Sequence, residues 1–121
     1  MKKKIIIVDD KIMIVKIIAA YLSAEYEFEY FDNPIPCLEK LETGTLPDLI
    51  ISDILMPHMR GDIFLDKIKN SERLKNIPVI MLSSEDSSSE RIRLLQNGAK
   101  DYIVKPFNPL ELKIRIKKIF E

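Results

Sequence analysis

The sequence predicts an α/β domain in which a parallel sheet is covered by helices on both faces. Three observations support this prediction. Short β-branched runs alternate with longer helical patterns five times along the chain. The length of 121 residues fits one domain. The composition, with 46% hydrophobic and 31% charged residues, can fill a core and still solvate a surface.

The first half of the chain shows two rounds of this alternation. Residues 5–8 form a continuous apolar run, which is typical of a strand buried on both faces. Residues 12–22 follow as a helix. Residues 27–31 alternate polar and apolar side chains, as an edge strand with one solvated face does. Asn33-Pro34 then supplies an N-cap and a first-turn proline for the second helix.

Three further strands are predicted at residues 49–51, 78–82 and 102–104, and a helix follows each of them. Ser87 and Glu90 have the spacing of a capping box at the start of the fourth helix. Five strands that alternate with five helices favour right-handed crossovers and a parallel sheet. The amphipathic second strand is expected at one edge of that sheet.

Composition excludes several classes of function. Lys and Arg together number 19, as do Asp and Glu, so the formal net charge is zero and a broad nucleic-acid-binding face is not expected. Cys37 is the only cysteine, which rules out an internal disulfide, and His58 is the only histidine, which rules out a Cys/His zinc cluster. No apolar run has the length of a signal peptide or a membrane span. We expect a cytoplasmic domain that binds neither nucleic acid nor membrane directly.

Polar side chains stand where four of the predicted strands end. Asp9-Asp10 follows the first strand, Asp53 the third, Ser83 the fourth and Lys105 the fifth. Because ligands of open parallel sheets bind at the carboxyl ends of the strands, we expect these side chains to converge. Crowded carboxylates repel one another, and Mg²⁺ relieves that repulsion. A carboxylate there can attack phosphorus, while the metal and an ammonium neutralise the transferred group.

Each of these residues also has an ordinary structural interpretation. Asp9-Asp10 is typical of a turn or a helix N-cap, and Asp53 can cap a loop. Ser83 is a common strand-end hydroxyl, and Lys105 before a proline suits a solvated turn. These interpretations would have to hold at four strand ends together, which favours the phosphoacceptor site.

With these motifs the chain resembles a response regulator receiver domain, the chemotaxis-regulator-like phosphoacceptor module of two-component signalling. The matching segments are residues 5–10, 51–61, 80–84 and 98–107. The spacing agrees as well, since 30 residues separate Asp53 from Ser83 (83 − 53) and 22 separate Ser83 from Lys105 (105 − 83). The resemblance implies one receiver domain over residues 1–121, with a flavodoxin-like (βα)5 fold and strand order 2-1-3-4-5.

The resemblance also implies a metal site and an acceptor. Asp53 matches the aspartate that is phosphorylated. Asp10 and Asp53 match the side-chain ligands of Mg²⁺, the backbone carbonyl of Leu55 a third ligand, and Asp9 a carboxylate that helps through water. Lys105 matches the lysine of the family site. The apolar side chain of Leu55 cannot orient water, and Glu85, two residues after Ser83, does so only in part, so we expect a long-lived phosphorylated state.

The resemblance also implies a conformational switch that responds to phosphorylation. Ser83 takes the place of the hydroxyl that engages the phosphoryl group, and Tyr102 that of the aromatic that moves with it. Phosphorylation is then expected to alter the surface of the fourth helix, fifth strand and fifth helix. The Lys105-Pro106 bond matches the cis peptide of the family.

The expected phosphodonor is a histidine kinase or a histidine phosphotransfer protein, and a homodimer on phosphorylation is an additional option. The first helix is apolar nearly all round, although packing on a sheet needs only one stripe. Ile14, Ile17, Ile18 and Tyr21 or Leu22 are predicted to supply that stripe. Docking of the donor is predicted on the other row, formed by Ile12, Met13, Val15 and Ala19.

Two other functions stay open from the sequence. A phosphatase or phosphotransferase would use the same aspartate chemistry but would need a substrate-gripping insertion. A degenerate interaction module would lack one of the key residues. The chemistry expected here is self-modification rather than enzymatic turnover. Two organisations also stay open: a single-domain regulator, and a receiver within a longer regulator or hybrid kinase.

Overall fold

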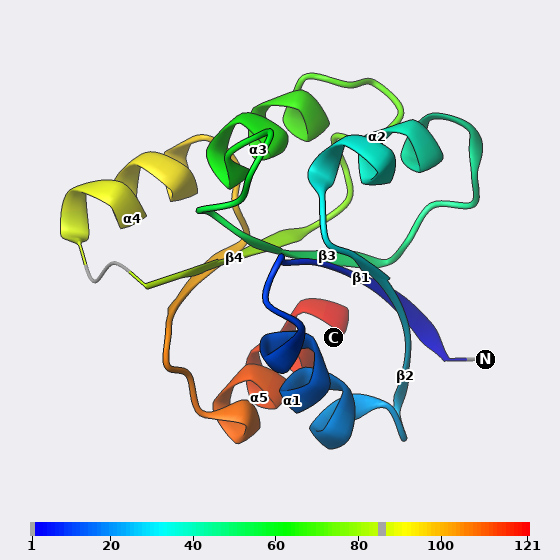
Figure 1. Cartoon of the computed structure of the whole chain (residues 1–121), viewed down its shortest axis with the longest axis vertical. Coiled ribbons are helices and arrows are strands. Elements are labelled where there is room, and N and C mark those ends of the chain that lie inside the picture. The colour runs from blue at the N-terminus through cyan, green and yellow to red at the C-terminus, as the bar shows by residue number, and fades with distance from the viewer. Residues whose placement is uncertain (1, 85–86) are drawn as a thin grey trace.

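The computed structural model describes residues 2–84 and 87–121, and in them five parallel strands form one sheet (Figure 1). The strands are β1 (Lys3–Val8), β2 (Tyr26–Phe31), β3 (Leu49–Asp53), β4 (Val79–Ser83) and β5 (Asp101–Val104). They pair side by side in the order β2-β1-β3-β4-β5. The predicted flavodoxin-like fold, with β2 at one edge, is confirmed.

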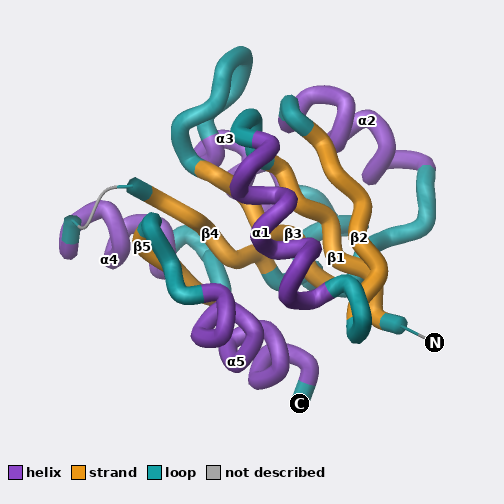
Figure 2. The backbone as a smooth tube through the Cα atoms, turned by 60° about the horizontal axis from the view of Figure 1, so that its bottom comes forward, coloured by secondary structure: helices purple, strands orange, loops and turns teal. Residues whose placement is uncertain are grey.

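Helices cover both faces of the sheet in these described residues. They are α1 (Ile12–Leu22), α2 (Pro34–Thr43), α3 (Gly61–Lys69), α4 (Ser88–Gln96) and α5 (Pro109–Phe120). Figure 1 shows α2, α3 and α4 on one side of the sheet and α1 and α5 on the other. Figure 2 shows α1 lying over the sheet, and α5 contacts α1.

The sheet separates two apolar cores, because successive side chains of a strand point to opposite faces. Ile5 and Ile7 of β1 pack with α1 and α5, whereas Ile6 and Val8 pack with α2, α3 and α4. All four side chains are at most 1% exposed. Because β1 is buried on both faces, residues 5–8 form a continuous apolar run in the sequence.

Capping residues begin three of the helices, and those at Asn33 and Ser87 were predicted. The Oδ1 of Asn33 accepts the N–H of Ile35 at 3.0 Å, and the Oδ1 of Asn108 accepts that of Leu110 at 2.9 Å. The Oγ of Ser87 accepts the N–H three residues later at 3.3 Å. These bonds satisfy N–H groups that have no partner within the helix. The N-cap of α1 is different, because Lys11 makes no side-chain capping bond.

The predicted inner face of α1 is wrong in part. The buried residues of α1 are Val15, Ile18 and Leu22, at i, i+3 and i+7, whereas Ile17 and Tyr21 are exposed. Val15 therefore does not belong to a docking surface.

The reason is that α1 contacts both the sheet and α5, so its inner face is rotated from the predicted one. Ala19 and Ile14 lie half-buried at the border of that face. The large apolar side chains that remain exposed on α1 are Ile12, Met13, Ile17 and Tyr21.

Two further findings bear on the sequence predictions. Glu85, for which a weak effect on water was predicted, lies outside the described residues. Within residues 2–84 and 87–121, every helix is too short or too polar to cross a membrane.

Candidate functional site

Three carboxylates meet at the carboxyl end of the central strands. Asp9 and Asp10 directly follow β1, and Asp53 is the last residue of β3. The two strands are neighbours, with Val8 opposite Ser52, so their ends lie side by side. Each of the three residues offers a carboxylate oxygen, and these oxygens lie within 4.8 Å of one another. Asp9 and Asp53 are buried, whereas Asp10 is exposed.

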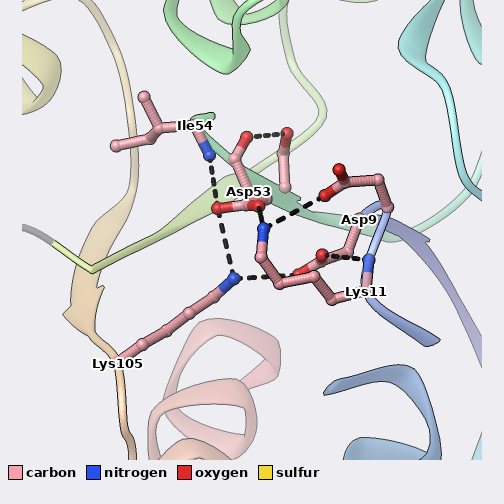
Figure 3. A network of polar contacts seen from close by, with 7 residues as sticks. Asp9, Lys11, Asp53, Ile54 and Lys105 are labelled. Atoms are coloured by element: carbon pink, nitrogen blue, oxygen red, sulfur yellow. Dashed lines mark hydrogen bonds and ion pairs between the residues drawn. The ribbon is translucent and has the colours of Figure 1, made fainter. Parts of the chain in front are cut away.

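Lys105 reaches this cluster from the loop after β5. Its Nζ lies 3.0 Å from Oδ2 of Asp9 and 3.2 Å from Oδ1 of Asp53 (Figure 3). The side chain is only 11% exposed, so these ion pairs are shielded from water. The backbone N–H of Lys105 donates to the carbonyl of Ser83, which ties the loop to the end of β4. The Lys105–Pro106 peptide bond is cis, as the resemblance implies.

A second lysine, Lys11, contacts the same aspartate and was not predicted as part of the site. Its Nζ lies 3.2 Å from Oδ2 of Asp53 (Figure 3) and 3.2 Å from Oδ1 of Asp10. Its side chain is 55% exposed. The backbone N–H of Lys11 donates to Oδ1 of Asp9 at 2.8 Å, which holds that buried carboxylate in place. The sequence signal was a lysine at a helix N-cap, where short polar acceptors are favoured.

The backbone around Asp53 is held by short-range hydrogen bonds. The N–H of Ile54 donates to Oδ1 of Asp53 at 2.8 Å, and the Oγ of Ser52 donates to its carbonyl at 2.8 Å. The N–H of Gly61 donates to the carbonyl of Ile54 at 2.7 Å. A Cβ at Gly61 would lie 2.1 Å from the carbonyl oxygen of Asp53. Only a glycine fits behind Asp53, a constraint the sequence did not reveal.

The remaining predicted residues surround the cluster at different depths. Ser83, at the end of β4, is 3% exposed and follows Leu82, which pairs with Asp53 in the sheet. Tyr102 is 6% exposed, belongs to the core beneath α4, and has the guanidinium of Arg91 5.8 Å from its ring centroid. Leu55, two residues after Asp53, has an exposed side chain.

Burial and ion pairing shift the pKa values of the cluster in opposite directions. Burial raises the pKa of Asp9 above its usual value, and the charge of Asp53 adds to this effect. The N–H of Lys11 and the ammonium of Lys105 only partly oppose it. For Lys11, partial desolvation lowers the pKa, but the bond to Asp10 and the charge of Asp53 outweigh it, so the net direction is upward.

The donor set of the cluster suits a hard divalent cation. Carboxylate oxygens are the ligands that Mg²⁺ prefers, and it is commonly held by one or two of them with waters. Two ammonium groups face three carboxylates here, which leaves one negative charge. The residues present therefore fit Mg²⁺. Asp10 lies on the exposed side of the cluster, and Asp53 lies on the buried side.

An open α/β sheet with a carboxylate cluster and a lysine at its carboxyl end is the architecture of an aspartate phosphoacceptor domain. Comparison with known proteins specifies the family. The family model of the response regulator receiver domain matches residues 5–117. The chain belongs to this family, whose members are phosphoacceptor domains of two-component signalling.

Individual relatives agree with this assignment. The chain is 36% identical over 95% of its length to hybrid signal transduction histidine kinase D of Dictyostelium discoideum. It is 33% identical over 98% of its length to the phosphate regulon transcriptional regulatory protein PhoB of Escherichia coli. It spans only 7% and 52% of these two proteins, respectively.

Among solved structures, the chemotaxis response regulator CheY4 of Vibrio cholerae superposes with a TM-score of 0.89 at 32% identity. The similarity covers 98% of this chain and 99% of that one.

Proposed function

We propose that Asp53 accepts a phosphoryl group from a histidine kinase or a histidine phosphotransfer protein. The observation that carries this proposal is the position of two lysines beside the Asp53 carboxylate. Asp53 is 3% exposed, and an ammonium group lies 3.2 Å from each of its oxygens. The carboxylate can act as a nucleophile, and these positive charges oppose the charge of the incoming phosphoryl group. Several relatives are histidine kinases by name, which supports the nature of the donor.

Mg²⁺ is the proposed cofactor. Asp10 and Asp53 would hold it directly with the backbone carbonyl of Leu55, and Asp9 would assist through water. When bound, the cation neutralises charge on the phosphoryl oxygens. Lys105 would pair with the transferred group, because its Nζ already lies 3.2 Å from Asp53. The backbone N–H of Ile54 holds the acceptor in position.

The proposed response to phosphorylation is a coupled change at Ser83 and Tyr102. Ser83 ends the strand beside Asp53, and Tyr102 lies on the next strand, opposite Met81. A hydrogen bond from the Ser83 hydroxyl to the phosphoryl group would favour one of two local arrangements. The change would alter the surface of α4, β5 and α5, on which an output partner or domain would act.

The test of the acceptor uses a small phosphodonor, acetyl phosphate, with and without Mg²⁺. Mass spectrometry of the intact protein and its peptides should place one phosphoryl group on Asp53, only when Mg²⁺ is present. Asp53→Asn should remain unlabelled, and Asp48→Asn, on an exposed aspartate of the β3 entry loop, serves as a matched control. Equal labelling of Asp53→Asn and the wild type would overturn the assignment.

The test of the switch is an NMR comparison with and without a beryllofluoride mimic of the phosphoryl group. The amides of Ser83 and Tyr102 should shift together, and Ser83→Ala should remove the shift at Tyr102. Changes confined to the loop around Asp53 would contradict the coupling.

Docking of the phosphodonor protein is proposed on the exposed apolar patch of α1, which consists of Ile12, Met13, Ile17 and Tyr21. Met13 and Tyr21 are 63% and 50% exposed, and the patch begins directly beside the acidic cluster. Such a surface is typical of a partner site. Helices of a kinase bundle would bury it while bringing the phosphohistidine to Asp53.

The docking test replaces Met13 by glutamate. Met13→Glu should slow phosphotransfer from the donor protein and leave labelling by acetyl phosphate unchanged. Ile63→Glu, at an exposed position of α3 on the other face of the sheet, is the matched control. Unchanged transfer to Met13→Glu would contradict the proposal.

Three further expectations complete the proposed function. Residues 1–121 are proposed to act as one receiver domain located in the cytoplasm. Its chemistry would be limited to its own phosphorylation and dephosphorylation, without turnover of a separate substrate. Association of two phosphorylated copies is a further expectation, which the elution volume of the beryllofluoride form would test.

A further inference from the structure

Lys11 occupies a position that local structure does not explain. It is the N-cap residue of α1, yet its side chain makes no capping hydrogen bond. Short side chains that accept hydrogen bonds are favoured at an N-cap. A positive charge near the N-terminus of a helix also opposes the helix dipole. A lysine is therefore unfavourable here unless contacts outside the helix compensate for it.

The compensating contacts are with two carboxylates of the acidic cluster. The Nζ of Lys11 lies 3.2 Å from Oδ1 of Asp10 and 3.2 Å from Oδ2 of Asp53, and Figure 3 shows the contact with Asp53. These are the two side chains proposed as direct ligands of Mg²⁺. A cation that binds both at its usual distance of about 2.1 Å would come close to the ammonium group, and the two positive charges would repel each other.

We propose that Lys11 is a tethered counter-ion that competes with Mg²⁺ for Asp10 and Asp53. It would thereby set the Mg²⁺ concentration at which the domain becomes ready for phosphorylation. This inference rests on the proposed function, because it requires the cation to enter this cluster. Its new content is that the chain carries its own competitor for that site.

The exposure of the two lysines indicates which of them yields to the metal. The side chain of Lys11 is 55% exposed, so it can rotate into solvent with little loss of packing. Lys105 is 11% exposed and also pairs with the buried Asp9, so it is expected to stay. When Lys11 leaves, the net charge of the cluster changes from −1 to −2, which matches a divalent cation.

The test measures Mg²⁺ affinity of the unphosphorylated protein by isothermal titration calorimetry. Lys11→Met should bind Mg²⁺ about tenfold more tightly than the wild type, since two ion pairs no longer have to be broken. Lys11→Arg should stay close to the wild type because it keeps the charge. Lys16→Met, at an exposed lysine of the same helix, is the matched control and should not change the affinity.

The same variants provide two readouts that do not depend on binding heat. Without Mg²⁺, Lys11→Met should melt at a lower temperature than the wild type, because repulsion within the cluster increases. Its melting temperature should rise more when saturating Mg²⁺ is added. In the wild type, the ¹³Cε resonance of Lys11 should move during a Mg²⁺ titration as the ammonium leaves the carboxylates.

The outcomes separate this inference from the proposed function. If the wild type binds Mg²⁺ and Lys11→Met binds it equally or more weakly, the competition is overturned and the phosphoacceptor site stands. A Lys11 resonance that stays fixed while the amides of Asp10 and Asp53 shift would also overturn it. If the wild type and every variant bind no Mg²⁺ and remain unlabelled by acetyl phosphate, both proposals fail.

Discussion

The two oxygens of Asp53 lie in different surroundings. Oδ1 faces the buried side, where it contacts Lys105 and the N–H of Ile54. Oδ2 faces the open side, where it contacts Lys11. Both lysines lie 3.2 Å away, but their side chains are 11% and 55% exposed. The distances are equal, but the exposure differs: the ion pair with Lys105 is shielded from water, whereas the ion pair with Lys11 is open to solvent and is the one that we propose a metal displaces.

The largest expected effect comes from removing the lysine on the buried side. Lys105→Met should destabilise the metal-free protein by about 3 kcal/mol, because it leaves the fully buried Asp9 without its ionic partner. Lys11→Met should cost less than about 1 kcal/mol, as exposed ion pairs do. Urea denaturation with EDTA present measures both. Equal losses for the two variants would refute the distinction between the sides.

A somewhat smaller loss is expected when the backbone behind Asp53 is crowded. In Gly61→Ala the new Cβ would lie 2.1 Å from the carbonyl oxygen of Asp53 and 2.8 Å from Cα of Ile54. The backbone has to move, which should cost about 2 kcal/mol and slow phosphorylation by acetyl phosphate.

Gly44→Ala is the control for the crowding experiment. A Cβ at Gly44 would lie 2.9 Å from the carbonyl oxygen of Lys40, which does not belong to the candidate site. It should affect stability alone. Normal phosphorylation kinetics in Gly61→Ala would show that the acceptor tolerates the displacement.

A third expected effect concerns the buried carboxylate itself and depends on pH. Burial, with the charge of Asp53, raises the pKa of Asp9 in the folded state above its unfolded value. Ionised Asp9 therefore lowers stability above the folded-state pKa, and this cost disappears as the pH falls below the unfolded value. Without metal, Asp9→Asn should be more stable than the wild type at pH 7.

The gain in stability from Asp9→Asn should be smaller than the losses expected for Lys105→Met and Gly61→Ala. It should shrink as the pH falls toward 3. Urea denaturation across this pH range provides the measurement. A gain independent of pH would show that Asp9 does not titrate differently in the two states, and a loss at pH 7 would show that its ion pair outweighs its burial.

The smallest expected effect lies on the open side. Leu55 is 45% exposed and cannot orient water, whereas an amide side chain at this position could. Leu55→Asn should hydrolyse the aspartyl phosphate about threefold faster, which corresponds to less than about 1 kcal/mol of barrier. Decay of the labelled protein after removal of the donor measures the rate. Leu55→Met should decay like the wild type, and an equal rate in Leu55→Asn would contradict the role of the side chain.

The order of strands and helices could be predicted because the hydrophobic period differs so clearly between them. Runs such as residues 5–8 are buried on both faces, and caps such as Asn33 and Ser87 place the helix starts within a residue or two. The convergence of Asp9, Asp10 and Asp53 followed from the geometry of parallel strands, in which like ends share one edge.

Two features could not be predicted, for different physical reasons. Every residue of α1 except Lys16 is apolar, so its pattern fits more than one buried stripe. Contact with the sheet and α5 selects the face of Val15, which the sequence alone does not encode. Lys11 was missed because its long side chain leaves its own helix and bonds to a residue 42 positions away. Only its poor fit as an N-cap pointed beyond the local structure.

The separation of the two apolar cores by the sheet has a consequence for how this domain can evolve. No buried side chain is shared between the core beneath α1 and α5 and the core beneath α2, α3 and α4 in the described residues. Substitutions under one helical layer therefore need few compensating changes under the other. With the proposed docking on α1, recognition of a new phosphodonor can change through substitutions on one side of the sheet, while the packing around Tyr102 on the other side is retained.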